Sequence, residues 1–348
     1  MVSSIFPDKK YGMIIQKEPI SGLSVLICCY NAAPRLLPTL KHLALQKLGN
    51  ESACEIILIN NGSTDDTSSL AKNIWKECKE PFSLTIIEEP NPGKMNAIIA
   101  GVKAASFNII VFCDDDNWLR EDYLQKAFQL MEAYPEIGLA GGYSEGVTEG
   151  QFPEWFSANK QSFAVGRQAN VFECDMTAHP MAIWGAGTVS RKILLEKVCD
   201  PQFPFLLEDR KGYNIASGGD VEIARRIALL GYRIHYTEAL WLWHYMSPHR
   251  LNTSYLDSLT SFFPVSFKIN RKYFRQWEVA NWKPLERYLA LIKKLVKYVL
   301  GTLSGNQHLL EFSREYLYFL TGLRAFEDDQ SRLVRNFYKY YSINRRQD

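Results

Sequence analysis

The sequence predicts an α/β protein in which helices flank a mixed, mostly parallel sheet and a helical region follows at the C-terminus. In the first half of the 348 residues, apolar runs of strand length alternate with longer amphipathic stretches, a rhythm typical of β-α-β units. Polar turn residues follow these runs, and beyond Leu251 the pattern is mostly helical. The hydrophobic share of 47% and the charged share of 22% are those of a packed globular protein, which excludes disordered, collagen-like and disulfide-scaffold chains.

The first half predicts five strands with four helices between them. The apolar runs of strand length are Leu23–Cys29, Glu55–Asn60, Ser83–Glu88, Asn108–Cys113 and Ile137–Ala140. The stretches of helical period between them are Pro34–Gln46, Asp66–Cys78, Lys94–Ala105 and Glu121–Tyr134. Because a helix separates each strand from the next, we expect the strands to pair largely in parallel.

The second half is less regular. Beyond Gly142 the alternation ends, and we expect an extension of the sheet between Asn170 and Ile183, followed by helices at Arg191–Val198 and Asp220–Leu230. The chain therefore divides into an N-terminal extension at 1–21, a main domain at 22–250 and a helical, basic C-terminal region at 251–348.

The charge and the cysteines restrict the environment of the protein. The net charge is only +2, which argues against a nucleic-acid partner, but the residues from Lys268 onward hold 16 basic and 8 acidic side chains. The seven cysteines are odd in number and form no CxxC pair, so we expect reduced, buried thiols. The sequence shows neither a signal-peptide pattern nor a membrane-spanning run, and we expect a cytoplasmic location, at the inner face of the membrane if the tail binds lipid.

Polar side chains follow several predicted strands at the edge where a parallel sheet binds ligands. Tyr30 and Asn31 follow the first run, Asn61 the second, and three consecutive aspartates, Asp114–Asp116, the fourth. Carboxylates crowded in this way repel one another unless a cation or hydrogen-bond donors compensate, and a divalent metal that bridges to phosphate would do so. The alternative is a solvated acidic turn before the next helix, but the position directly after a buried strand favours a site.

Five segments together resemble the family 2 glycosyltransferases of the GT-A fold. They are Ser24–Asn31, Ile59–Thr67, Phe112–Asp116, Ile183–Gly187 and Ser217–Arg226. The resemblance covers roughly residues 22–250 and implies a Rossmann-like GT-A catalytic domain there. It also implies inverting transfer of a sugar from a nucleoside-diphosphate sugar, with a UDP-sugar favoured, and a divalent metal, Mn²⁺ or Mg²⁺.

The same resemblance implies roles for individual residues. The residues implied to bind the donor are Tyr30, Asn31, Asn61, Lys94, Asn96, Asp114, Asp115 and Arg250, and those implied to bind the metal are Asp116 and His244. The family usually has Asp where this chain has Asn61, which leaves the base of the donor open. From the residues alone, Lys94 and Asn96 equally fit an exposed first helical turn, His244 fits a packed aromatic core, and Arg250 fits a solvated turn.

On the acceptor side, Asp220 is implied to be the general base that removes a proton from the attacking hydroxyl. The family commonly has Glu before this Asp, whereas this chain has Gly219, and Glu222 is not expected to replace the missing carboxylate. Asp220 also fits the N-cap of a helix, which is compatible with catalysis. The residues implied to form the acceptor floor are Trp184, Gly185 and Gly187, although an aromatic core and a turn explain them equally well.

The basic tail and the function each leave alternatives open. The Trp282–Leu300 stretch is apolar but interrupted by lysines, so it either lies in a membrane interface, near lipid-linked acceptors, or packs on the catalytic domain. The main expectation is transfer to a saccharide or lipid-linked saccharide in cell-surface polysaccharide synthesis. One alternative is a nucleotidyltransferase, although no Gly-rich basic loop follows the first strand. The other is a non-catalytic sugar-nucleotide-binding or scaffolding protein, which Gly219 favours.

Overall fold

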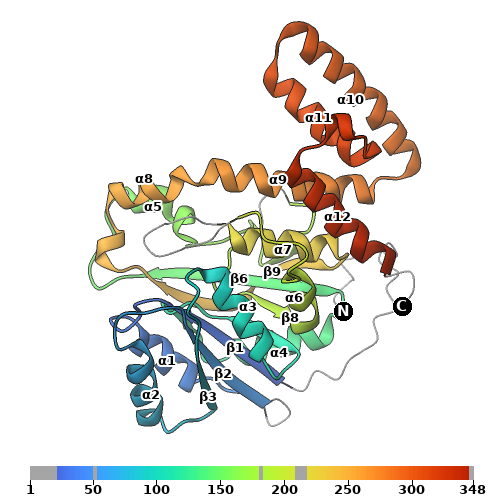
Figure 1. Ribbon diagram of the computed structural model, residues 1–348. Helices are drawn as coiled ribbons and strands as arrows, with labels where there is room; N and C mark the ends of the chain where they lie inside the picture. The colour runs from blue at the N-terminus through green and yellow to red at the C-terminus, as the bar shows by residue number, and fades with distance from the viewer. Residues whose placement is uncertain (1–21, 50–52, 180–182, 208–217, 345–348) are drawn as a thin grey trace.

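The computed structural model describes residues 22–49, 53–179, 183–207 and 218–344; the predicted extension at 1–21 lies outside them. These residues form a nine-stranded mixed sheet with helices on both faces (Figure 1). The strands are β1 (Gly22–Cys29), β2 (Ala53–Asn60), β3 (Ser83–Glu88), β4 (Ile109–Phe112), β5 (Asn117–Leu119), β6 (Ile137–Val147), β7 (Glu173–Asp175), β8 (Val189–Arg191) and β9 (Arg233–Tyr245). The predicted fold class is confirmed.

The strand order is β3-β2-β1-β4-β8-β6-β9-β5, and β7 pairs with β9 off this path. The pairs β1·β2, β2·β3, β1·β4 and β6·β9 are parallel, whereas β8, β5 and β7 each pair in the antiparallel direction. The first four predicted strands are thus present and parallel. The predicted strand Ile137–Ala140 continues to Val147, and β9, the longest strand, is absent from the sequence expectation.

Two layers of helices bury the two faces of the sheet. In chain order the α-helices are α1 (Leu36–Ala44), α2 (Thr67–Glu77), α3 (Lys94–Ala104), α4 (Tyr123–Ala133), α5 (Phe156–Asn159), α6 (Lys192–Val198), α7 (Gly219–Leu229), α8 (Thr253–Ser261), α9 (Phe263–Asn281), α10 (Pro284–Ser304), α11 (Gln307–Thr321) and α12 (Asp329–Asn344). Val25 and Ile27 of β1 pack with α1, α2 and α4, whereas Leu26 packs with α3, α6 and α7. Because successive side chains of a strand point to opposite faces, an uninterrupted apolar run such as β1 serves both layers.

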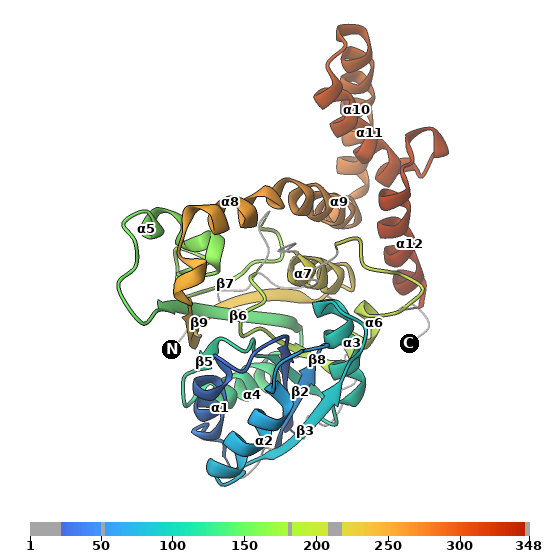
Figure 2. The same ribbon diagram turned by 60° about the vertical axis from the view of Figure 1, so that its left-hand side comes forward.

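The C-terminal region consists of two parts. Helix α9 packs on α7, and α12 packs on α9, so these helices belong to the body of the molecule. Helices α10 and α11 form a hairpin that projects from this body in both views (Figures 1 and 2). Among the described helices, none combines the length and the apolar character needed to cross a bilayer.

Candidate functional site

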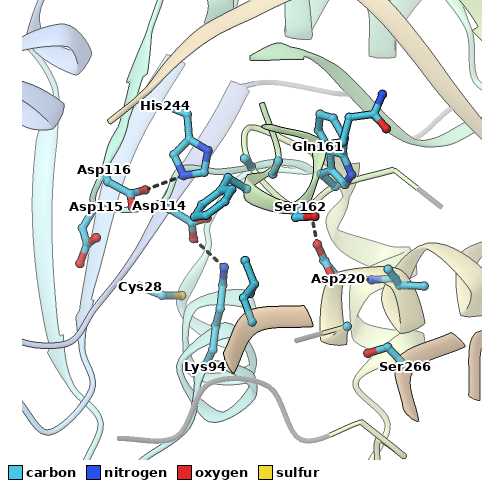
Figure 3. Close-up of a pocket in the computed structure, with 18 of the residues that line it drawn as sticks. Cys28, Lys94, Asp114, Asp115, Asp116, Gln161, Ser162, Asp220, His244 and Ser266 are labelled. Carbon is cyan, nitrogen blue, oxygen red and sulfur yellow. Dashed lines mark hydrogen bonds and ion pairs between the residues drawn. The ribbon is translucent and has the colours of Figure 1, made fainter. Parts of the chain in front are cut away.

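A cavity of about 660 Å³ opens at the carboxyl ends of β1, β2 and β4 and extends to the start of α7 and to α8 and α9. Eleven of the fourteen residues that the sequence singles out line it: Tyr30, Asn61, Lys94, Asp114, Asp115, Asp116, Trp184, Gly185, Asp220, His244 and Arg250. Figure 3 shows the aspartate triplet and Lys94 on one side of this space and Asp220 on the other. The structure therefore brings most of the predicted donor, metal and acceptor residues into one cavity.

Cationic side chains compensate the crowded carboxylates. The Lys94 Nζ atom lies 2.7 Å from Asp114 Oδ1, an ion pair that is visible in Figure 3. The Arg250 Nη1 atom lies 2.8 Å from Asp116 Oδ2, and both of these side chains are largely buried. Such charge-assisted bonds are short and strong, so the triplet is an organised electrostatic site and not a solvated turn.

The middle carboxylate, that of Asp115, is held by Arg35, which the sequence analysis did not identify. Arg35 Nε and Nη2 donate to Asp115 Oδ1 and Oδ2 at 2.7 and 2.6 Å, and the same guanidinium donates to the carbonyls of Tyr30 and Asn31. Burial raises the pKa of Asp115 to about 6, although Arg35 lowers it. Arg35 thus fastens the end of β1 to the loop after β4. A single Arg after the first strand does not indicate in the sequence that it will pair with Asp115.

The two predicted metal ligands, Asp116 and His244, lie close together because β5 pairs with β9. In this register Asn117 lies opposite His244, which places His244 Nε2 3.4 Å from Asp116 Oδ1. A carboxylate oxygen and an imidazole nitrogen that converge in this way fit two ligands of Mn²⁺ or Mg²⁺. Among the described residues, no group of three or more His, Cys, Asp or Glu side chains is arranged to hold a metal ion.

Asn61 uses its side-chain amide to hold the turn before α3. Its Nδ2 donates to the carbonyls of Glu89 and Asn91 at 3.2 and 2.6 Å, and its Oδ1 accepts from the backbone N–H of Gly93 at 2.7 Å. A carboxylate could not donate to the two carbonyls. These hydrogen bonds explain why the side chain at this position is an amide. Asn61 stabilises the turn that precedes Lys94.

Three predicted residues do not line the cavity. The Asn31 side chain accepts from the backbone N–H of Thr64, the Asn96 side chain donates to the carbonyl of Pro92, and Gly187 has a φ of +68° in a packed turn. Asn31 and Asn96 thus stabilise the loops at the strand ends, and Gly187 permits a backbone conformation that favours glycine.

Backbone groups fix the Asp220 carboxylate at the start of α7. Its Oδ2 accepts from the Gly185 N–H at 2.7 Å, and its Oδ1 accepts from the Val221 N–H at 2.8 Å. A Cβ atom on Gly185 would lie 2.7 Å from Asp220 Cβ, so only glycine allows this close approach. The neighbouring Trp184 is held through its backbone N–H by the Gln168 side chain. Asp220 is therefore both a helix-terminal residue and a positioned base candidate.

Glu222, as expected, does not substitute for the carboxylate missing at Gly219. It is completely buried beside Arg226, with which it forms an ion pair of 2.8 Å. It also accepts from the backbone N–H groups of Leu206 and Leu207 and from the Tyr273 hydroxyl. Glu222 therefore joins α7 and α9 to the segment that follows α6, and it does not line the cavity.

The C-terminal region supplies one wall of the cavity, which the sequence analysis did not anticipate. The residues of α8 and α9 that line it are Leu259, Phe263, Ser266, Phe267 and Asn270. Gly218, with a φ of +125°, lies under this wall, and a Cβ atom there would be 2.4 Å from Ser266 Oγ. No local sequence signal marks a contact between segments this far apart.

Residues 24–194 match the family described as Glycosyl transferase family 2. This segment includes β1, β2, β4 and the aspartate triplet. This part of the chain belongs to this family. The fold of the chain is the GT-A fold. It is similar to S. aureus TarS 1-349 in complex with UDP-GlcNAc at a TM-score of 0.50 and 14% identity, over 93% of this chain and 92% of that one.

Curated relatives match a shorter part of the chain. A poly-beta-1,6-N-acetyl-D-glucosamine synthase of Staphylococcus aureus is 30% identical over 128 residues, which are 37% of this chain and 30% of that protein. Glycosyltransferase GlyA of Streptococcus pneumoniae is 28% identical over 131 residues, 37% of this chain and 18% of that protein. The chain thus matches less than a third of the length of either relative.

Proposed function

We propose that the protein is an inverting glycosyltransferase that moves a sugar from a nucleoside-diphosphate sugar to a saccharide or lipid-linked saccharide. The observation that carries the proposal is the Asp220 carboxylate, held by two backbone N–H groups in the same cavity as the aspartate triplet and its cations. Single displacement at an anomeric carbon needs a base on one side of that carbon and a site for an anionic leaving group on the other.

In the proposed step, the acceptor oxygen forms a bond to the anomeric carbon while the bond from that carbon to the diphosphate oxygen breaks. The electron pair of the broken bond leaves with the diphosphate, and the hydroxyl proton passes to the Asp220 carboxylate. Trp184 offers an aromatic face on which a sugar ring can stack. Lys94 and Arg250 line the cavity beside the triplet and are the cations that we assign to the diphosphate oxygens.

Asp116 and His244 are the residues that we propose to hold a divalent ion. When bound, this ion would supply Lewis-acid stabilisation of the charge on the leaving diphosphate. Arg250 then has a second role, because its contact with Asp116 Oδ2 orients the carboxylate so that Oδ1 faces His244. Tyr30 at the end of β1 is the proposed contact of the nucleotide base, and Asp114 or Asp115 that of the ribose.

The ligand and the activity named for the similar proteins decide which substrates should be tested first. The UDP-GlcNAc complex with this fold makes UDP-sugars the first donors, and the polysaccharide synthase among the relatives supports a role in cell-surface polysaccharide synthesis. The family match does not favour a nucleotidyltransferase.

The test combines calorimetry with donors and measurement of slow donor hydrolysis in Mn²⁺, on the wild type and on Asp220→Asn and Asp116→Ala. Asp220→Asn keeps an oxygen for the Gly185 N–H, so donor binding should be unchanged while turnover falls about 10²- to 10⁴-fold. Asp116→Ala should lose metal-dependent donor binding. Asp122→Asn, on the surface beside Lys126, is the matched control and should match the wild type. If no donor binds in either Mn²⁺ or EDTA, the non-catalytic scaffold becomes the better interpretation.

A further inference from the structure

Helix α10 presents a continuous apolar stripe to solvent. Its members are Leu285, Tyr288, Leu289, Ile292, Leu295, Val296, Val299, Leu300 and Leu303, with exposed fractions between 42% and 79%. At 100° per residue these positions fall within one sector of the helix, and over 21 residues the stripe is roughly 30 Å long. Isolated exposed apolar residues are ordinary on a protein surface, but a contiguous stripe of this size marks an interaction site.

The opposite side of α10 is the one that packs against the protein. Gly301 lies against α11 so closely that a Cβ atom there would be 3.0 Å from the Leu310 nitrogen. Lys294 Nζ lies 3.5 Å from the centre of the Tyr316 ring, and the Tyr298 ring meets Phe326 edge to face. The contacts with α11 therefore account for the packed face and leave the apolar stripe uncovered. Among the described residues, this stripe stays exposed and does not pack on the catalytic domain, whereas Trp282, at the start of the stretch, packs on Tyr316.

Three charged residues flank one edge of the stripe: Lys293, Glu286 and Lys297. The two other cations of α10, Arg287 and Lys294, fall on the packed side of the helix. On the helical wheel Lys293 falls directly beside the apolar sector, and Lys297 lies next to it. A two-fold pairing of two copies through the stripe would bring these cations toward one another, whereas an anionic surface would attract them.

We infer that α10 docks the protein on an anionic lipid surface, with its apolar stripe in the interface and with Lys293 and Lys297 at the level of the headgroups. An amphipathic helix with a large apolar face and a basic polar face lies in the plane of a membrane without spanning it. The projection of the hairpin away from the body (Figure 2) gives this face access to a flat surface. The inference is independent of the donor, the acceptor and the proposed reaction.

The test is flotation of the full chain with vesicles, in the absence of donor and acceptor. One set of vesicles contains equal parts of phosphatidylglycerol and phosphatidylcholine, and the other contains phosphatidylcholine alone. The variant of the stripe combines Leu289→Ser, Ile292→Ser and Val296→Ser. The matched control combines Leu37→Ser, Leu45→Ser and Ile343→Ser, three exposed apolar residues outside α10.

We expect the wild type and the control to float with the anionic vesicles and the stripe variant to bind them at least about tenfold more weakly. A further variant, Lys293→Glu with Lys297→Glu, should weaken binding to anionic vesicles only, and added salt should mimic it. Absence of wild-type binding, equal binding by the stripe variant, or equal binding to the two vesicle types would overturn the inference. A dimer that the stripe variant dissociates, without vesicle binding, would assign the stripe to a second copy. Circular dichroism checks that each variant is folded.

Discussion

Substitution of Asn61 by Asp tests why this chain has an amide where its family usually has a carboxylate. The side chain is 6% exposed and donates to two backbone carbonyls, those of Glu89 and Asn91. Asn61→Asp removes both donated hydrogen bonds, at about 1 kcal/mol each, and directs a buried charge at two carbonyl oxygens, which adds about 1–2 kcal/mol. The bond accepted from Gly93 is retained. We therefore expect the free energy of unfolding to fall by about 2–4 kcal/mol.

Urea denaturation followed by tryptophan fluorescence measures this loss, and donor binding gives a second readout. Lys94 directly follows the turn that Asn61 holds, so donor affinity should fall more than kcat does. Protonation would give the new carboxyl group one donor for a carbonyl, so the loss of stability should shrink as the pH falls.

Asn96→Asp is the matched control, because the same chemical change there affects an exposed amide of the same turn, with longer bonds. It should change the free energy of unfolding by less than about 0.5 kcal/mol. If Asn61→Asp behaves like Asn96→Asp in both stability and donor binding, the explanation of the amide is wrong.

Three further predictions concern the base, the core beneath it and the hairpin. Gly185→Ala forces a Cβ atom against Asp220, so kcat should fall at least about tenfold in a transfer assay while donor affinity measured by calorimetry is retained. Glu222→Gln leaves the buried Arg226 cation without its partner and should lower the free energy of unfolding by about 3–5 kcal/mol in urea denaturation; a loss below 1 kcal/mol would contradict a buried ion pair. Burial lowers the pKa of Lys294 to about 8, so the folded chain releases this proton more readily than the unfolded chain and stability should rise between about pH 8 and pH 10. Lys294→Met should show a smaller rise in the same denaturation series, and an identical rise would refute the assignment.

The sequence predicts which residues of the first half meet at the cavity, because that arrangement depends on local rules. Apolar runs give β1, β2 and β4, and parallel strands end at one edge, so Tyr30, Asn61 and the aspartate triplet must lie close together. These inferences need only the order of the elements and the alternation of side chains along a strand.

Strand β9 was missed although the sequence contains a signal for it. Along its second half, Leu240, Leu242 and His244 are buried while Trp241 and Trp243 are partly exposed, which is the two-residue period of a strand. The partly exposed positions are tryptophans and not polar residues. The hydropathy along the strand therefore does not show the alternation between buried and exposed side chains. The enrichment in aromatic residues would have indicated a strand.

The remaining parts of the site depend on contacts between distant segments. Arg35 contacts Asp115, which is 80 positions away in the sequence. Helix α9 contributes Ser266 and Asn270 to a cavity whose other wall lies at the carboxyl ends of β1, β2 and β4. A single basic side chain, or a polar residue on a C-terminal helix, has many possible partners. Only the packing of the whole chain selects one of them.

Within the C-terminal region, the hairpin and the helix that lines the cavity are linked by buried charges. Glu315 of α11 forms ion pairs with both Lys272 and Arg275 of α9, and the side chains of these two cations are 3% and 4% exposed. Removal of the Glu315 carboxylate would leave the buried Arg275 charge without this partner, which costs several kcal/mol, whereas Lys272 would keep its ion pair with Asp328. The base of the hairpin is therefore fixed to the helix that lines the cavity. It follows that a surface bound by the apolar stripe of α10 would hold the cavity in a defined orientation, which is what transfer to a lipid-linked acceptor requires.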